Sequence, residues 1–138
     1  VLNSNTELQV QTGLAVQSGV ISGTGRLFKT GSGTLVLTAA NTYTGGTSVR
    51  QGTLTVGSTG SIADSAGEMI IGHINGDNGT LILTAGGSIT ATSARIGSNI
   101  GSQGTANISG TWTNVGGMRV GGAGTGLLEI SGAGSVSN

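Results

Sequence analysis

The sequence predicts an all-β protein, a parallel β-helix with three sheets and about six coils. Three observations lead to this prediction. Gly makes up 29 of the 138 residues, and Gly, Thr, Ser and Asn together exceed half of the chain, so good helix formers are scarce. Apolar residues still reach 35%, and they alternate with polar residues over short segments. The second half of the chain also repeats itself at a nearly constant spacing.

The repeat in the second half is clearest at its turn glycines. Gly72 and Gly97 are 25 positions apart, and Gly97 and Gly121 are 24 apart. Each repeat contains three short strand-like segments separated by Gly-rich turns. In the middle segment, alternate positions are apolar: these are the pairs Leu81/Leu83, Ala106/Ile108 and Leu128/Ile130. A period of two predicts strands with one buried face.

A unit of three short strands cannot bury its apolar face alone, whereas stacked units bury a continuous core. We therefore expect each strand to pair in parallel with its equivalent one coil later. The expected core residues are Leu27, Leu35, Leu37, Val49, Leu54, Val56, Ile71, Leu81, Leu83, Ile89, Ile96, Ile108, Trp112, Val120, Leu128, Ile130 and Val136.

The first half follows a related pattern with different residues. Its expected strands are Thr6–Val10, Leu14–Val16, Val20–Ile21, Leu27–Lys29, Thr34–Thr38, Thr47–Arg50 and Leu54–Val56. Residues 57–68 break the rhythm and are interpreted as an irregular connection. The whole of 1–138 is thus one β-helix, with coils of one type in 1–56 and three repeats of 24–25 residues in 69–138.

Composition narrows the range of partners and reactions. Five basic residues balance five acidic ones, so the chain has no basic stripe for nucleic acid or for an anionic membrane. There is no Cys, which removes disulfides and thiol chemistry. The single histidine, His73, has no second His or Cys with which to hold a metal. The acidic residues are scattered, so we expect no catalytic, metal or cofactor site.

Four side chains are candidates for contact with a ligand. The rings of Tyr43 and Trp112 could stack on a sugar, although Trp112 occupies a core position of the repeat and Tyr43 could instead pin a turn. Arg95 and Arg119 occupy equivalent positions in successive repeats and could form a small basic ridge, with solvated surface as the alternative.

Short Thr-x-Thr pairs occur at 42/44, 53/55, 90/92 and 111/113. They fall at different phases of the repeat, so we do not expect them to align into a single Thr face. Side faces rich in Thr, Ser and Asn could nevertheless form hydrogen bonds with another copy of the chain.

One stretch is specific enough to resemble a known family. Residues 23–56 read GTGRLFKTGSGTLVLTAANTYTGGTSVRQGTLTV, which resembles the passenger-associated transport repeat of bacterial autotransporters. The matching positions are Gly25, Leu27, Lys29, Gly31, Gly33, Thr34, Leu35, Leu37, Asn41, Tyr43, Gly45, Gly46, Thr47, Val49, Gly52, Leu54 and Val56. Ala40 departs from the family, which has Gly before the Asn.

The resemblance implies a right-handed β-helix in a secreted, surface-exposed passenger, anchored at the outer membrane by a barrel of the same polypeptide. It also implies a stalk that promotes translocation and folding at the cell surface. The alternative is an adhesin that binds host glycans, matrix or another protein, or that associates with itself between cells. A polysaccharide-active enzyme would need acids or bases clustered on one sheet, and too few charges are present.

Overall fold

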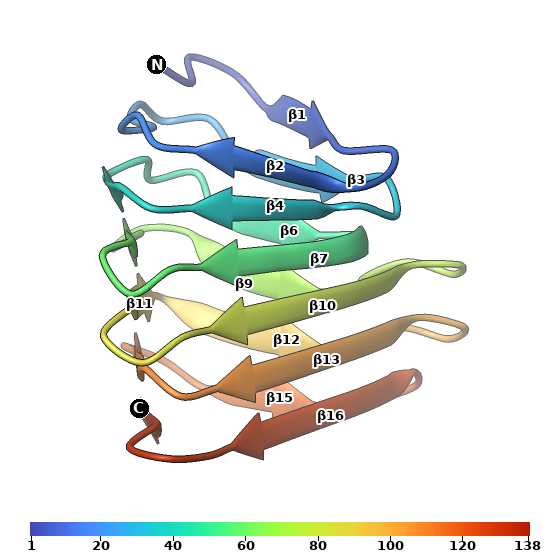
Figure 1. Cartoon of the computed structure of the whole chain (residues 1–138). Coiled ribbons are helices and arrows are strands. Elements are labelled where there is room, and N and C mark those ends of the chain that lie inside the picture. Colours follow the sequence, from blue (N-terminus) through green and yellow to red (C-terminus); the bar gives the residue numbers. More distant parts are fainter.

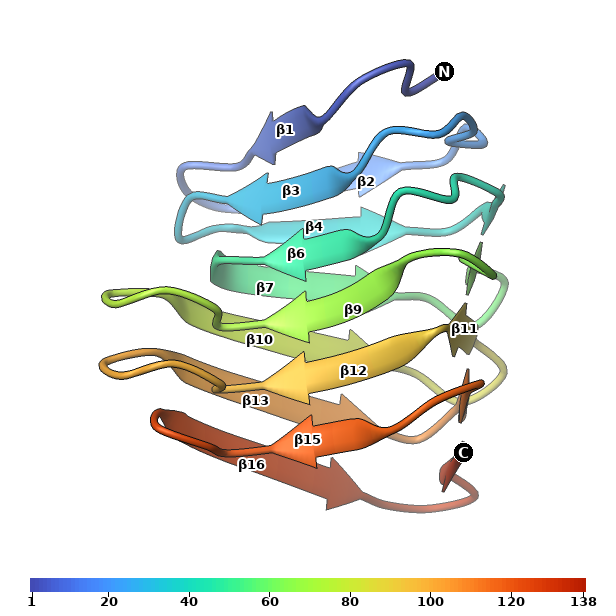
Figure 2. The same ribbon diagram turned by 180° about the vertical axis from the view of Figure 1, so that it is seen from behind.

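Alternation of apolar and polar residues gives 17 short strands, and each strand pairs in parallel with its equivalent one coil away. The computed structural model describes all residues, 1–138, and forms a right-handed β-helix of six coils (Figures 1 and 2). The predicted fold class is therefore confirmed. No helix is present, and so none could span a membrane.

The strands form three sheets that run along the solenoid. The first sheet contains β1 (Thr6–Gln9), β3 (Leu27–Thr30), β6 (Thr47–Val49), β9 (Glu68–Ile71), β12 (Ser93–Ile96) and β15 (Met118–Val120). The second sheet contains β2 (Leu14–Gln17), β4 (Thr34–Leu37), β7 (Gln51–Val56), β10 (Asn78–Leu83), β13 (Gln103–Ile108) and β16 (Thr125–Ile130). The third sheet contains β5 (Ala40–Asn41), β8 (Ser61–Ala63), β11 (Ser88–Ala91), β14 (Thr111–Asn114) and β17 (Ser135–Ser137).

Three corners join the sheets in every full coil. The first corner leads from the first sheet to the second, the second corner from the second sheet to the third, and the third corner on to the next coil. At the first corner of the last three coils, Gly72, Gly97 and Gly121 have φ values of 66°, 61° and 75°. Residues with a Cβ rarely adopt this left-handed conformation, so the turn glycines found in the sequence are required by the backbone.

Side chains of the same type stack along the core. Leu54, Leu81 and Ala106 occupy one inward column of the second sheet, and each is completely buried. Most of the expected core is buried in the same way. The prediction was wrong for Val120 and Ile130, which are 43% and 51% exposed. Their coil has a neighbour on one side only, so no further coil covers their inward side chains.

The structure differs from the expected strands in two places. Val20–Ile21 is not a strand: the N–H of the buried Ile21 donates to the side chain of Asn41 and not to a strand ladder. The segment 57–68 contains a regular strand, β8, which pairs in register with β5 and β11. The two-residue strand β5 and the three-residue strand β8 are too short for apolar alternation to be recognised.

Candidate functional site

The part of the chain that resembles the transport repeat, together with the corner that follows β8, has buried polar side chains at its corners. We call Lys29, Asn41, Tyr43, Thr47 and Asp64 the corner cluster; each is at most 1% exposed. Buried polar groups are costly unless they are hydrogen bonded, so the partners of each residue decide what the cluster does.

Lys29 closes the first corner. Its side chain points inward from β3, and its Nζ donates to the carbonyl oxygens of Thr30 at 2.9 Å, Gly31 at 2.8 Å and Gln51 at 3.0 Å. Two of these carbonyls belong to its own turn, and the third belongs to the next coil. The ammonium therefore satisfies all three of its donors and joins two successive coils. Burial lowers the pKa of Lys29 below its ordinary value.

Asn41 closes the second corner and connects three coils. Its Oδ1 accepts the N–H of Ile21 at 2.9 Å, and its Nδ2 donates to the carbonyl oxygens of Ala39 at 2.9 Å and Ser61 at 3.1 Å. An apolar side chain at this position would remove all three hydrogen bonds and leave the N–H of Ile21 without its acceptor, whereas the carbonyl of Ala39 would still accept the N–H of Ser61. Asn41 therefore fixes the position of each coil relative to its neighbours.

Tyr43 and Asp64 close the third corner. The phenolic oxygen of Tyr43 lies 2.6 Å from Thr47 Oγ1, and Asp64 Oδ1 accepts the N–H of Gly67 at 2.6 Å. Burial raises the pKa of Tyr43 well above its ordinary value, and the nearby charge of Asp64 raises it further. Burial also raises the pKa of Asp64, whereas hydrogen bonds from backbone N–H groups, that of Gly67 foremost, act in the opposite direction.

Two of the four residues expected to contact a ligand cannot do so in this structure. Tyr43 and Trp112 are both 0% exposed, so neither ring offers a face on which a sugar could stack. Trp112 lies in the core column of Ile89 and Val136, and its Nε1 donates to Asn114 Oδ1 at 3.1 Å. The core and turn alternatives therefore replace the ligand-contact prediction for these two residues.

Arg95 and Arg119 do lie together. They are register partners in β12 and β15 on the outer face of the first sheet. Arg95 Nε is 2.8 Å from Glu68 Oε1, whereas Arg119 makes no hydrogen bond or ion pair within the chain. The structure thus places one neutralised and one unpaired guanidinium side by side.

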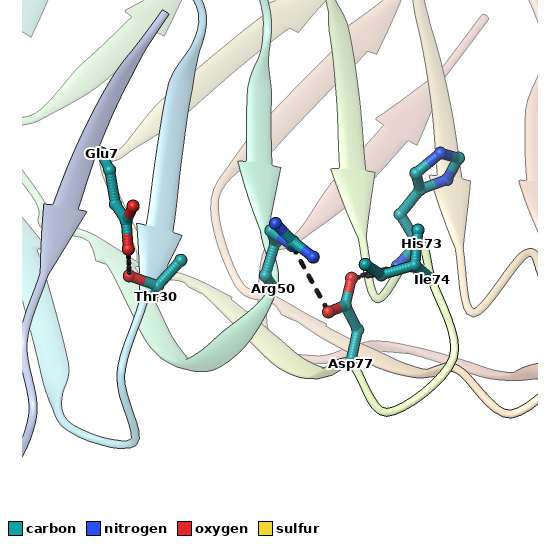
Figure 3. Close-up of polar contacts among 6 residues, drawn as sticks. All are labelled: Glu7, Thr30, Arg50, His73, Ile74 and Asp77. Carbon is teal, nitrogen blue, oxygen red and sulfur yellow. Dashed lines mark hydrogen bonds and ion pairs between the residues drawn. The ribbon is translucent and has the colours of Figure 1, made fainter.

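A loop at the first corner of coil four contains the only histidine. Asp77 Oδ2 accepts the N–H groups of His73 at 3.1 Å and Ile74 at 3.0 Å, and Asp77 Oδ1 is 3.4 Å from Arg50 Nε (Figure 3). The imidazole points away from the Asp77 carboxylate (Figure 3). The acidic residues Glu68 and Asp77 are therefore each paired with a different arginine, and no group of three or more metal-ligating side chains is found.

The outer face of the third sheet carries aligned rows of Ser and Thr side chains that were not predicted from the sequence. Two outward columns consist almost entirely of small hydroxyl side chains: Ser61, Ser88, Thr111 and Ser135 in one, and Ala63, Thr90, Thr113 and Ser137 in the other. The Thr-x-Thr pairs themselves do not align, as expected, because 53/55 lies on the second sheet. Treating Ser and Thr as equivalent would have revealed the face.

Comparison with known proteins supports the resemblance. Residues 27–56, which run from β3 to β7, match the family model of the passenger-associated-transport-repeat. In an alignment 80 positions long that covers 52% of the chain, the sequence is 42% identical to the adhesin BmaC autotransporter of Brucella suis biovar 1. The chain spans 2% of that relative's length. No solved structure matches the chain.

The fold and the matched repeat define the class: a β-solenoid segment of a surface-exposed bacterial protein. Residues 27–56 thus carry the transport repeat, and the chain is similar to a segment of an autotransporter passenger, a kind of protein that is secreted to the cell surface.

Replacing the buried ammonium tests the first corner. In Lys29→Met, three carbonyl oxygens lose the hydrogen bond from the ammonium, although that of Thr30 still accepts the N–H of Val10, and we expect the free energy of unfolding to fall by about 3 kcal/mol. Arg119→Met removes an exposed cation and should change it by less than about 0.5 kcal/mol. Urea unfolding followed by the fluorescence of Trp112, the only tryptophan, measures both. Equal stability of the two variants would contradict the role assigned to Lys29.

The raised pKa of Tyr43 predicts a loss of stability in alkali. An unfolded tyrosine ionises at about pH 10, whereas the folded chain retains the proton, so stability falls as pH rises above that value, by at most about 1.4 kcal/mol per pH unit. The lowered pKa of Lys29 has the opposite sign and acts below about pH 10.4, so it does not mask this fall.

Tyr43→Phe should remove this alkaline dependence while leaving that of Lys29 in place. Because Tyr43 is the only tyrosine, its ionisation can be followed directly by ultraviolet absorbance. We expect tyrosinate to appear only together with unfolding. Ionisation at about pH 10 in the folded chain would show that the phenol is accessible to solvent.

Proposed function

We propose that this chain is a β-helical stalk segment and that its transport repeat promotes translocation and folding of the passenger at the cell surface. The observation that carries the proposal is the corner cluster: each corner of the repeat is closed by a buried, fully hydrogen-bonded side chain. The partner in the same polypeptide is the outer-membrane barrel implied by the autotransporter class.

The contacts of the cluster are suited to folding in sequence. Lys29 bonds two carbonyls of its own turn before it needs Gln51 of the next coil. Asn41 likewise bonds Ala39 within its own coil and Ser61 one coil later. Each coil can therefore form on the coil before it, as expected of a solenoid in which contacts link neighbours only. Coils that fold outside the membrane would oppose backward sliding of the chain.

A disulfide between coils tests whether the chain must pass through the membrane unfolded. Thr53 and Thr80 are outward register partners in β7 and β10, about 4.8 Å apart at the usual strand spacing. The double variant Thr53→Cys, Thr80→Cys can therefore form a disulfide with little distortion. The native chain contains no Cys, so any effect on transport is due to the new pair.

The variant is fused to an autotransporter barrel and displayed on bacteria, with surface exposure measured by antibody. We expect display to fall under oxidising growth and to recover with a reductant. The two single Cys variants are the controls and should be displayed normally. Normal display of the oxidised double variant would contradict threading in an unfolded state.

The second candidate function is adhesion, favoured by the name of the relative and by the uncharged hydroxyl face of the third sheet. Flat rows of hydroxyl groups could form hydrogen bonds with a second copy of the chain or with a host glycan or matrix protein. This role does not exclude that of a stalk, because it uses outward side chains only.

Light scattering of the purified chain tests self-association through this face. Thr111→Glu places a charge among the exposed hydroxyls of the third sheet and should reduce association, because paired faces would bury that charge. Thr125→Glu, at the first position of β16 on the second sheet, is the matched control and should associate like the native chain. A native chain that stays monomeric at all concentrations would rule out self-association.

A further inference from the structure

The first sheet has a shallow hollow on its outer face, over β12 and β15 (Figure 2 shows these strands side by side). Its volume is about 360 Å³, within the range of small-ligand sites. Arg95 and Arg119 border it as register partners, and the rest of its lining consists of Glu68, Ser93, Ala94, Gly117 and Met118.

The hollow exists because the side chains become smaller along one outward column of the first sheet, from Glu to Ser to Gly. Glu68 and Ser93 are register partners, and the N–H of Ala94 donates to the carbonyl of Gly117, which places Gly117 next in the column. A Cβ added at Gly117 would meet no atom within 4 Å. The missing side chain therefore leaves open space beside the two arginines.

The charges around this space are unbalanced. Glu68, which is 17% exposed, pairs with Arg95 at 2.8 Å and accepts a hydrogen bond from Ser93 Oγ at 3.1 Å through the same Oε1 atom. Its Oε2 has no partner within the chain, and Arg119 has neither a hydrogen bond nor an ion pair. The hollow thus offers one free guanidinium, one free carboxylate oxygen and one hydroxyl.

We propose that this hollow binds an acidic sugar, with the sugar carboxylate on Arg119 and a sugar hydroxyl on Glu68 Oε2. A guanidinium holds a planar carboxylate through two parallel hydrogen bonds, which is the strongest match for the unpaired cation. A carboxylate acceptor beside it suits a ligand that also carries hydroxyl donors. Sugar acids combine both groups within the size of one ring.

Other anionic ligands fit this set less well. A peptide with several acidic side chains would bring a second carboxylate close to Glu68 and be repelled by it. A nucleic acid needs several cations along its backbone, and only Arg119 is unpaired here. The proposal does not depend on the role in translocation, because the hollow is formed by outward side chains.

The test is a titration of the ¹⁵N-labelled chain with glucuronic acid, followed by amide chemical shifts. Glucose is the neutral match, glucose 6-sulfate tests another anion, and a short Glu-rich peptide tests a protein ligand. We expect weak binding, with shifts confined to β12, β15 and residues around Gly117. Arg119→Gln should weaken binding by about tenfold, since it removes a charged bidentate pair. Arg50→Gln, an arginine outside the hollow, should leave it unchanged.

Each alternative result would overturn the proposal. Equal shifts with glucose would show that the carboxylate is not recognised, and tighter binding of the sulfate or the peptide would assign the hollow to that ligand. Binding that survives Arg119→Gln would place the ligand elsewhere. Unfolding in urea confirms that both variants are folded, so a loss of binding cannot be ascribed to loss of structure. Absence of all binding would reject the site and leave the stalk function untouched.

Discussion

The structure depends on backbone hydrogen bonds that join every coil to the next. In a parallel solenoid, each strand satisfies its N–H and C=O groups on neighbouring coils, so an error at one corner would displace all three sheets beyond it. Backbone groups outside the strand ladders take part as well: 39 of the 83 backbone–backbone hydrogen bonds lie there. The turn glycines follow from this constraint, because the chain must reverse within a few residues and still present its amides to the coil above.

Stacking of apolar side chains alone does not determine the register between neighbouring coils. The buried polar residues of the corner cluster determine it. The inward column that contains Lys29 continues with Val49, Ile71 and Ile96, and the column of Asn41 continues with Ile62, Ile89 and Trp112. In the later coils these columns are apolar, and apolar side chains accept several registers at similar energy. A buried Lys or Asn is stable only where its own set of carbonyl and amide partners is present, so a shift by one coil would leave charged and polar groups unpaired. Polar residues within the matched repeat thus make the core less apolar, and in return they restrict the coils to a single register.

The sequence was sufficient for the fold because the signals that determine it are local and repeated. Alternation, turn glycines and the spacing of Gly72, Gly97 and Gly121 are visible without any knowledge of contacts. The features that the sequence did not predict depend on contacts with residues far away in the chain. Val120 looked like a core residue because its own strand alternates correctly, but its burial requires a further coil. Asp64 lay in a segment without rhythm, and only the stacking of coils shows that it is buried. For Tyr43, the sequence allowed either an exposed ring or a buried side chain that stabilises a turn, since a position in a motif does not show which way its side chain points.

The separation of inward and outward side chains also explains how one rod can serve more than one purpose. Along each strand, every second residue faces solvent, so the outer faces can change without disturbing the core. The three faces already differ: the first sheet carries Arg95, Arg119 and Glu68, whereas the outward columns of the third sheet carry no charge at all. Equivalent positions repeat at the strand spacing of about 4.8 Å, so one ligand can contact the side chains of several coils at once. A fold whose stability comes from the inside of the coils therefore leaves its sides free to acquire ligands, provided that the corners still close.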